Sequence, residues 1–183
     1  MKSEIAEHSV DLSLLPEKAN ILDIGCFGFA FTDAMRALGH TVFPVDIQLL
    51  DKEYFHCAIS DYIGFCNAKM IGNDLQATRM VRASSGIPCW TLEAFSDNQN
   101  IPFWDLIKID VEGSEYEIIM SLSKAPAKQL SIEFHLHTQV YGQIEMRMME
   151  DKLKALGYEA VSHDYTAQHG AGFNYWDSLF ILK

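Results

Sequence analysis

The chain lacks the features of membrane, secreted and disulfide-rich proteins. No apolar run approaches the roughly 20 residues that a membrane-spanning helix needs. The N-terminal stretch MKSEIAEHSVDLSLLPEK has no apolar core of a signal peptide. The four cysteines show no Cys-x-x-Cys spacing and have apolar neighbours, which predicts buried thiols in a reducing compartment. We therefore expect a cytoplasmic protein.

Positive charge is also scarce. The sequence has 14 Lys and Arg residues against 25 Asp and Glu residues, which gives a formal net charge of −11. Phosphate contacts need clustered positive charge, so neither a nucleic acid nor an anionic membrane is expected as a partner. Nothing in the composition indicates the oligomeric state.

The order of the apolar segments predicts the fold class. With 183 residues the chain is expected to form one domain, 1–183. Short apolar runs predict strands at 20–25, 41–47, 55–60, 104–110, 129–136, 158–163 and 177–183, and longer periodic segments predict helices at 31–40, 116–122 and 143–158. Strands separated by helices are typical of an α/β fold, with a mostly parallel sheet covered by helices on both faces. Residues 1–19 are expected to be helical or irregular, and residues 62–89 to form a hairpin or flap over a cleft.

Three of the predicted strands end in residues that suit an adenosine ligand. Open parallel sheets bind ligands beyond the carboxyl ends of their strands. The first strand ends in Asp23 and Gly25, before a helix whose free N–H groups can receive a polar head. The second ends in Asp46, whose carboxylate can accept both hydroxyls of a ribose. The third ends in an apolar wall and two hydrogen-bonding residues: Ile59, Ser60 and Asp61.

The glycine spacing argues against a ligand that carries phosphates. The run Gly25-Cys26-Phe27-Gly28-Phe29-Ala30 lacks the G-x-G-x-x-G of dinucleotide-binding loops, and the sequence has no G-x-x-x-x-G-K-[ST] motif. Taken singly, a glycine turn is common and Asp46 could cap a helix. Taken together, the three strand ends predict a ligand that carries adenosine without phosphates.

A second group of polar residues lies near the ends of two later strands. Side chains alternate along a strand, so each strand presents polar groups on one face: Asp110 and Glu112 after the first, Glu133 and His135 on the second. If the strands are neighbours, these four side chains converge above the sheet. Such a cluster is costly unless it is paired, metal-bound or catalytic. A structural alternative is that Glu112 only favours the next helix, where Ser114 and Glu117 resemble a capping box.

Five segments together resemble the FkbM-type family of S-adenosylmethionine-dependent methyltransferases: ILDIGCFGFAFTDAM, HCAISDYIGFC, CWTLEAF, DLIKIDVEGSEYEIIMSL and LSIEFH. The string IKIDVEGSEYE is the most specific of them. The resemblance runs from about Asn20 to the final strand. It implies a Rossmann-like class I methyltransferase fold with a seven-stranded, mostly parallel sheet whose last strand is antiparallel. It also implies O-methyl transfer, typically to sugar or polyketide-like hydroxyls.

The resemblance also implies roles for individual residues. By position, the cofactor-binding residues would be Asp23, Gly25 and Cys26 at the methionine end, Asp46 at the ribose, and Ile59, Ser60 and Asp61 near the adenine, with Gly28 and Ile47 beside them. Asp110 falls where class I O-methyltransferases place a catalytic or metal-binding acid. Asp110, Glu133 and His135 are therefore the candidate catalytic residues and the candidate ligands of a divalent cation. An all-oxygen set would suit Mg²⁺, whereas a histidine shifts the preference toward softer ions.

The leading hypothesis is an S-adenosylmethionine-dependent O-methyltransferase that acts on a sugar or another small hydroxyl-bearing acceptor. The second hypothesis is a binding module that keeps the fold without turnover. It is motivated by Phe27 and Phe29, which stand where the family has a small or polar residue and a glycine, and by the short N-terminal region, which is expected to leave little room for an acceptor lid. A nucleotide-dependent oxidoreductase is a third hypothesis, which the missing glycine disfavours.

Overall fold

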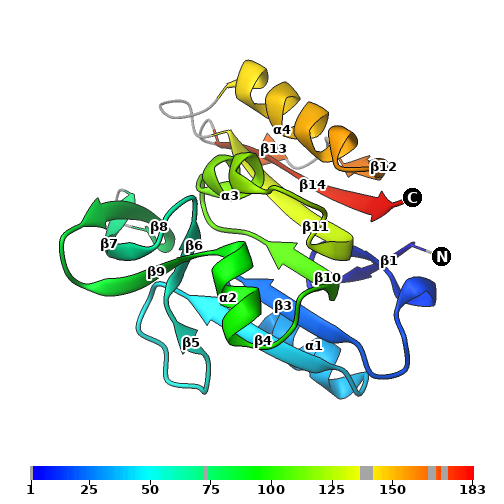
Figure 1. Ribbon diagram of the computed structural model, residues 1–183, viewed down its shortest axis with the longest axis horizontal. Coiled ribbons are helices and arrows are strands. Elements are labelled where there is room, and N and C mark those ends of the chain that lie inside the picture. Colours follow the sequence, from blue (N-terminus) through cyan, green and yellow to red (C-terminus); the bar gives the residue numbers. More distant parts are fainter. Residues whose placement is uncertain (1, 72–73, 137–141, 165–167, 170–172) are drawn as a thin grey trace.

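A central mixed β-sheet organises the protein (Figure 1). The computed structural model describes residues 2–71, 74–136, 142–164, 168–169 and 173–183. The strands of this sheet are β3 (Asn20–Ile24), β4 (Thr41–Asp46), β5 (Phe55–His56), β10 (Trp104–Ile109), β11 (Ala127–Leu136), β12 (Tyr158–Asp164) and β14 (Phe173–Leu182), with β13 (Gln168–His169) paired to β14. Their order across the sheet is β5–β4–β3–β10–β11–β14–β12.

The directions of the strands agree with the predicted α/β sheet. Neighbours from β5 to β11 run parallel, and β14 runs antiparallel to both β11 and β12. The strands at the centre read as continuous apolar runs because both faces of the sheet are covered. Ile21, Leu22 and Ile107, for example, are fully buried. The carboxyl ends of β3, β4 and β10 therefore lie together at one edge.

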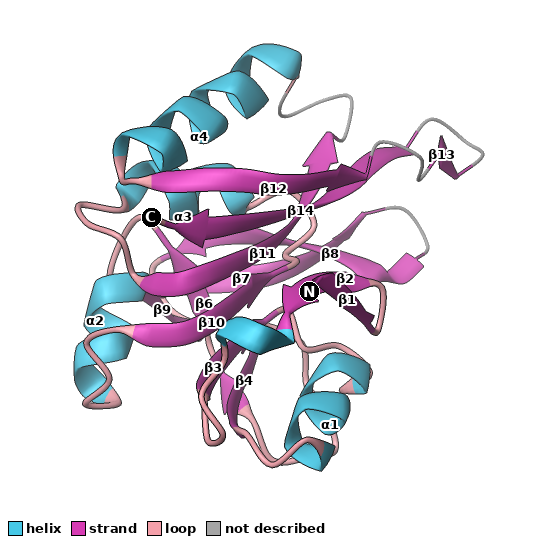
Figure 2. Cartoon of the chain, turned by 90° about the vertical axis from the view of Figure 1, so that its right-hand side faces the viewer, coloured by secondary structure: helices cyan, strands magenta, loops and turns pink. Residues whose placement is uncertain are grey.

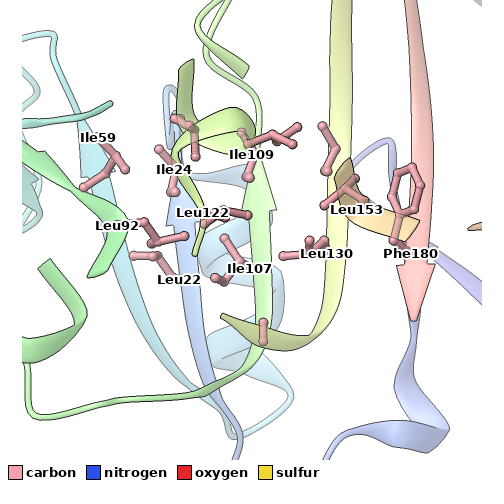
Figure 3. Close-up of a cluster of buried hydrophobic side chains, with 14 of the residues drawn as sticks. Leu22, Ile24, Ile59, Leu92, Ile107, Ile109, Leu122, Leu130, Leu153 and Phe180 are labelled. Atoms are coloured by element: carbon pink, nitrogen blue, oxygen red, sulfur yellow. The ribbon is translucent and has the colours of Figure 1, made fainter. Parts of the chain in front are cut away.

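Three helices cover one face of the sheet: α2 (Leu92–Asn98), α3 (Glu115–Ser121) and α4 (Gln143–Ala155). Their apolar side chains pack on strand residues such as Leu22, Ile107 and Leu130 to form the main hydrophobic core (Figure 3). Leu92 of α2 and Leu153 of α4 belong to this core and are almost completely buried. Burial of one such leucine stabilises a fold by about 1.5–3 kcal/mol relative to leaving it exposed.

A helix and a hairpin share the opposite face (Figure 2). They are α1 (Ala30–Ala37) and the antiparallel pair β1 (Lys2–Ile5) and β2 (His8–Asp11). A smaller core joins Val10 of β2 to Phe31 and Met35 of α1, over Ile21 and Leu106 of the sheet. Helices are expected on both faces, but in the described part of the chain this face carries a single α-helix, and the hairpin covers part of the rest.

The N-terminal segment is therefore different from the helical or irregular 1–19 that the sequence suggests. Only a short 3₁₀ turn, η1 (Leu12–Leu14), follows the hairpin. The hairpin is held by contacts from distant parts of the chain. The buried side chain of Gln129 in β11 accepts a hydrogen bond from the Asp11 N–H at 3.0 Å and donates one to the Asp11 carbonyl at 3.1 Å. Such tertiary pairing leaves no trace in the local pattern of residues 1–19.

A second sheet stands beside the first, with the order β6–β9–β7–β8. Its strands are β6 (Ala58–Ser60), β7 (Gly64–Ile71), β8 (Asp74–Ala83) and β9 (Ile87–Thr91). The predicted strand 55–60 is thus wrong as one element: it divides at Cys57 between β5 in one sheet and β6 in the other. The segment 62–89, expected as a hairpin or flap, contains the antiparallel pair β7 and β8 and continues into β9. Strand β9 and helix α2 do not appear among the predicted elements. None of the described helices is long and apolar enough to cross a bilayer.

The turn between β1 and β2 offers a test of stored backbone strain. Ala6 and Glu7 both have left-handed backbone angles, with φ of +47° and +70°. Two-residue hairpin loops of this kind favour Asn-Gly, since other residues pay roughly 1–2 kcal/mol each in that region. We expect the double substitution Ala6→Asn and Glu7→Gly to raise the free energy of unfolding by about 1 kcal/mol. Urea denaturation measures this, and an unchanged or lower midpoint would show that the turn is not strained.

Candidate active site

A cavity of about 260 Å³ opens at the carboxyl ends of β3, β4 and β10. Most of the predicted site residues line it: Asp23, Gly25, Cys26, Asp46, Ile47, Ile59, Asp110 and Glu133. Four others are not among the lining residues: Gly28, Ser60, Asp61 and His135. The turn of the N-terminal hairpin adds three residues that no motif indicated: Ala6, Glu7 and His8. Residues of the predicted cofactor and acceptor groups thus border one cavity.

The first wall of the cavity is the loop after β3, and it depends on Gly25. The Gly25 N–H donates to the Val45 carbonyl at 2.9 Å, and the Asp110 N–H donates to the Ile24 carbonyl at 3.0 Å. Gly25 has a φ of +81°, and a Cβ atom there would lie 1.7 Å from the Asp110 carbonyl oxygen. Glycine is needed because the backbones of this loop and of the β10 end touch.

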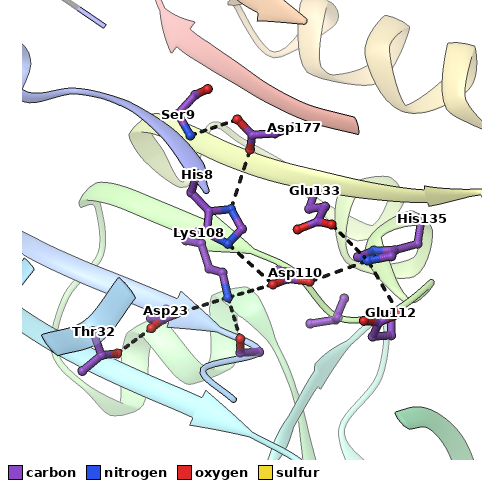
Figure 4. Close-up of polar contacts among 12 residues, drawn as sticks. His8, Ser9, Asp23, Thr32, Lys108, Asp110, Glu112, Glu133, His135 and Asp177 are labelled. Carbon is purple, nitrogen blue, oxygen red and sulfur yellow. Dashed lines mark hydrogen bonds and ion pairs between the residues drawn. The ribbon is translucent and has the colours of Figure 1, made fainter. Parts of the chain in front are cut away.

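Lys108 ties the ends of β3 and β10 together beneath the cavity (Figure 4). Its buried ammonium donates to the Gly25 carbonyl at 2.5 Å and lies 3.2 Å from Asp23 Oδ1 and 3.3 Å from Asp110 Oδ2. Thr32 of α1 donates to the other oxygen of Asp23 at 2.5 Å. Burial acts to lower the pKa of Lys108, but the two carboxylates raise it above its usual value. Lys108 is therefore a permanent cation that compensates two carboxylates.

The loop after β10 has an unusual backbone that Glu115 stabilises. Glu112 and Gly113 have φ values of +54° and +101°. The buried Glu115 carboxylate accepts hydrogen bonds from the Val111 N–H at 3.2 Å and the Gly113 N–H at 3.1 Å. The capping box suggested for Ser114 and Glu117 is not formed, because Ser114 makes no capping bond with its side chain. Glu115 performs the structural function instead.

The predicted convergence of polar groups is present beside this loop. His135 Nε2 lies 3.8 Å from Asp110, 3.6 Å from Glu112 and 3.5 Å from Glu133 (Figure 4). Its Nδ1 lies 3.0 Å from Glu115. Burial lowers the pKa of His135, but Glu115 and the other carboxylates raise it to about 10, so the imidazolium donates to Glu115. For Glu133, burial and then the charge of Asp110 raise the pKa to about 7.

His8 and Asp177 complete the cluster from the far ends of the chain. His8 Nε2 lies 3.6 Å from Asp110 Oδ2, and its Nδ1 lies 3.6 Å from Asp177 Oδ1. The other oxygen of Asp177 accepts the Ser9 N–H at 2.9 Å. Burial lowers the pKa of His8, while Asp110 and Asp177 raise it to about 9. No sequence signal marked either residue, because neither belongs to a recognised motif.

The predicted metal ligands do not form one set. Among the residues that the structure describes, two trios place one donor atom each within 4.8 Å of the others: His8, Asp110 and Glu133, and Asp110, Glu112 and His135. The predicted trio of Asp110, Glu133 and His135 is divided between them. Asp110 is common to both because it stands at the centre of the cluster.

The predicted ribose-binding residue Asp46 lines the cavity, whereas Ser60 and Asp61, predicted near the adenine, do not. Asp46 is nearly buried at the end of β4, where its Oδ1 accepts the Gln48 N–H at 2.8 Å and burial raises its pKa. The exposed Asp61 lies 3.5 Å from Arg82 Nη2 and accepts a bond from Ser60 at 3.2 Å, outside the cavity lining. Asp46 alone of these residues offers a carboxylate to the cavity.

Only one of the two unusual phenylalanines borders the cavity. Phe27 lines it and is 42% exposed. Phe29 is 3% exposed, is not among the lining residues, and packs edge-on against Tyr54 with ring centroids 6.3 Å apart. The ring of Phe29 therefore does not fill the space between Asp46 and Asp110.

Comparisons with known proteins agree with this geometry. Residues 30–160 match the Methyltransferase FkbM domain. Among curated proteins, none matches the sequence. The fibrillarin pre-rRNA processing protein of Methanococcus jannaschii superposes with a TM-score of 0.52 at 11% identity, covering 100% of this chain and 82% of that one. A TehB-like SAM-dependent methyltransferase from Corynebacterium glutamicum gives 0.45 at 11% identity, covering 93% and 84%.

The two kinds of comparison carry different information. At 11% identity a superposition shows a shared fold and nothing of the substrate, and this holds for the fibrillarin structure. The domain match, in contrast, extends over most of the chain, from α1 to β12, and includes the β10 end and the Glu133 strand that border the cavity. The chain therefore belongs to the FkbM family of methyltransferases.

Proposed function

We propose that the protein transfers the methyl group of S-adenosylmethionine to a hydroxyl of a small acceptor, such as a sugar. The observation that carries this proposal is that Asp46 and the pair Asp110 and Glu133 face one cavity. The carboxylate of Asp46 suits the ribose of the cofactor at one end of the cavity. Those of Asp110 and Glu133 suit the acceptor hydroxyl at the other end. A cavity with carboxylates at both ends disfavours a ligand that carries phosphates.

The residues at the β3 and β4 ends fit the cofactor. Asp46 keeps a carboxylate oxygen beyond the one that accepts the Gln48 N–H. Ile59 gives an apolar wall near it, and Gly25 and Cys26 form the turn opposite. The ammonium and sulfonium groups of S-adenosylmethionine are cationic, so the acidic lining favours them over a phosphate-bearing nucleotide. When bound, S-adenosylmethionine supplies an electrophilic methyl group.

At the acceptor end the chain would align and deprotonate the hydroxyl. Methyl transfer is an in-line displacement, so alignment of the two reactants is most of what the protein contributes. Glu133 is our candidate proton acceptor because it borders the cavity and its carboxylate has an oxygen within 4.8 Å of Asp110. His135, predicted as catalytic, is not among the lining residues, and we assign it a positioning role that holds Glu133 and Glu112.

The N-terminal hairpin and Phe29 weaken the rival hypothesis of a module without turnover. Little room for an acceptor lid was expected in the N-terminal region, but Ala6, Glu7 and His8 of the hairpin border the cavity. Phe29 packs against Tyr54 instead of narrowing the methionine end. Phe27 does line the cavity, so cofactor binding and turnover decide between the module and the enzyme.

Calorimetry with S-adenosylhomocysteine tests the cofactor half of the proposal. We expect Asp46→Asn to weaken binding about tenfold, since one charge-assisted hydrogen bond is worth roughly 1.5–3 kcal/mol and the amide keeps part of it. The matched control is Asp61→Asn, which removes a carboxylate that faces Arg82 and should leave the affinity unchanged.

Three results would contradict the proposal or its assignments. Absence of heat with the unmodified protein at millimolar ligand would reject the cofactor. Equal losses of affinity in Asp46→Asn and Asp61→Asn would mean that Asp61 also binds the cofactor, as predicted for the adenine. Binding without methyl transfer to any compound in a library of sugars and other alcohols would favour the binding module.

A further inference from the structure

We propose that His8, Asp110 and Glu133 form a binding site for a divalent transition-metal cation at the acceptor end of the cavity. The use of this cation in catalysis rests on the proposed methyl transfer, whereas its binding does not. The site differs from the predicted trio in replacing His135 by a residue of the N-terminal hairpin. Each of the three residues borders the cavity, so an ion and an acceptor could reach them.

The spacing of the donor atoms suits coordination. One atom from each residue lies within 4.8 Å of the other two. Two ligands that are each about 2.1 Å from a cation stand 3.6 Å apart when the angle between them is roughly 120°, and 3.6 Å is the separation of His8 Nε2 from Asp110 Oδ2. The other two pairs of donor atoms lie within 4.8 Å, so side-chain rotations that shorten these separations by up to about 1 Å would complete the coordination.

The state of the His8 ring is the second observation. The side chain is about 95% buried, yet the nearest carboxylate oxygens lie 3.6 Å from each ring nitrogen, beyond hydrogen-bond distance. His8 Nδ1 and Asp177 Oδ1 have no hydrogen-bond partner within the described part of the chain. Burial of such polar atoms is costly unless they are satisfied. A cation at Nε2 would leave the proton of the ring on Nδ1, which faces Asp177 Oδ1.

Asp177 would then orient the metal ligand His8 through the ring nitrogen that does not bind the cation. Histidines that bind metals almost always donate their other ring N–H to a carboxylate or carbonyl, which fixes the ring orientation. Asp177 is placed for this, because its Oδ1 faces His8 Nδ1 and its Oδ2 is held by the Ser9 N–H. The arrangement carboxylate–histidine–cation is thus prepared by β2 and β14, from opposite ends of the sequence.

The charge around the site also favours a cation. Six carboxylates lie in the cluster or next to it: those of Asp23, Asp110, Glu112, Glu115, Glu133 and Asp177. Lys108, the one lysine that the described residues place there, lies 3.2 Å from Asp23 and 3.3 Å from Asp110 and so compensates two of them. Even with both histidines protonated, the carboxylates outnumber the cations in this partly buried region. A divalent cation would reduce the excess.

The other trio is a weaker candidate. His135 is not among the residues that line the cavity, and its Nδ1 already lies 3.0 Å from Glu115.

The proposed ligands are one imidazole, from His8, and two carboxylates, from Asp110 and Glu133. This set suits Mn²⁺ or Zn²⁺ better than Mg²⁺. The cation would polarise the acceptor hydroxyl and make its proton more acidic. Glu133 would bind through one oxygen and keep the other for the proton that the hydroxyl loses as the methyl–sulfur bond breaks.

Direct binding of Mn²⁺ tests the site without cofactor or acceptor. Protein freed of metal with a chelator is titrated with Mn²⁺ and followed by electron paramagnetic resonance. We expect one ion per chain, at least tenfold weaker binding for His8→Gln and Glu133→Gln, and a smaller loss for His135→Gln, which only holds Glu133. The matched control is His40→Gln, which should leave binding unchanged because His40 accepts the Ala19 N–H and does not line the cavity. Asp177→Asn should weaken Mn²⁺ binding by about tenfold or more, as do other substitutions of residues that hydrogen-bond to a metal ligand.

Each contrary outcome has a definite meaning. No bound Mn²⁺ at millimolar concentration, or loss of binding in His135→Gln but not in His8→Gln, would overturn the proposal. If circular dichroism shows that His8→Gln does not fold, Glu133→Gln decides, and full binding by that variant would overturn it. Calorimetry with S-adenosylhomocysteine on the same samples separates the two proposals, because a protein that binds the cofactor product and no metal refutes only the cation site.

Discussion

Replacement of Lys108 by methionine is expected to lower the free energy of unfolding by about 3–5 kcal/mol, the usual cost of breaking a buried ion pair from one side. The ammonium lies within 3.3 Å of both Asp23 and Asp110 and donates to the Gly25 carbonyl. Methionine has a similar length but leaves these carboxylates without their cation. Asp23 is fully buried, so water cannot replace the lost interaction there.

The control for this substitution is Lys52→Met. Lys52 also pairs with a carboxylate, Asp33, at 2.6 Å, but both side chains are about half exposed. Exposed pairs contribute about 0–1 kcal/mol. Urea denaturation of the two variants at pH 7 compares the same chemical change in a buried and an exposed setting. Similar losses would mean that Lys108 does not compensate the cluster.

Gly25→Ala is expected to lower the free energy of unfolding by more than about 3 kcal/mol, or to prevent folding. The left-handed backbone alone costs a residue with a Cβ roughly 1–2 kcal/mol. The added Cβ would also lie 1.7 Å from the Asp110 carbonyl oxygen, so the loop after β3 must move away from β10. This movement would open the cavity wall, and cofactor-product binding should be lost together with stability.

Gly39→Ala separates the two causes. Gly39 follows α1 with a φ of +94°, and a Cβ there would meet nothing within 4 Å. Its replacement carries the backbone cost of roughly 1–2 kcal/mol and no clash. Thermal and urea denaturation of both variants give the difference. If Gly25→Ala were no worse than Gly39→Ala, the close approach of the two backbones would not be a constraint.

The predicted parts of the site are those that depend on local chemistry. Asp46 and Gly25 end buried strands, and an α/β sheet brings the carboxyl ends of parallel strands to one edge. Glu133 and His135 alternate with apolar residues along β11, so their common face followed from the period of a strand. Their convergence with Asp110 depended on β10 and β11 being neighbours. The two strands do pair, and His135 lies 3.8 Å from Asp110 and 3.5 Å from Glu133.

The parts that escaped prediction depend on partners far along the chain. Gln129 holds the hairpin at Asp11, and Asp177 holds the residue next to His8 across 168 positions of sequence. The pattern of residues 1–19 contains nothing of these contacts, which made the segment look irregular. The same holds for the division of 55–60, where each half pairs with a different sheet.

Residue order therefore determined the alternation of strands and helices, the apolar faces and the acids at the strand ends. The tertiary structure decided that His8, and not His135, borders the cavity, and that Glu115 holds the loop after β10. The physical reason is that hydrophobic periodicity and backbone preference act over a few residues. A buried polar group, in contrast, is satisfied by whichever partner the folded chain brings within about 3 Å, however distant in sequence.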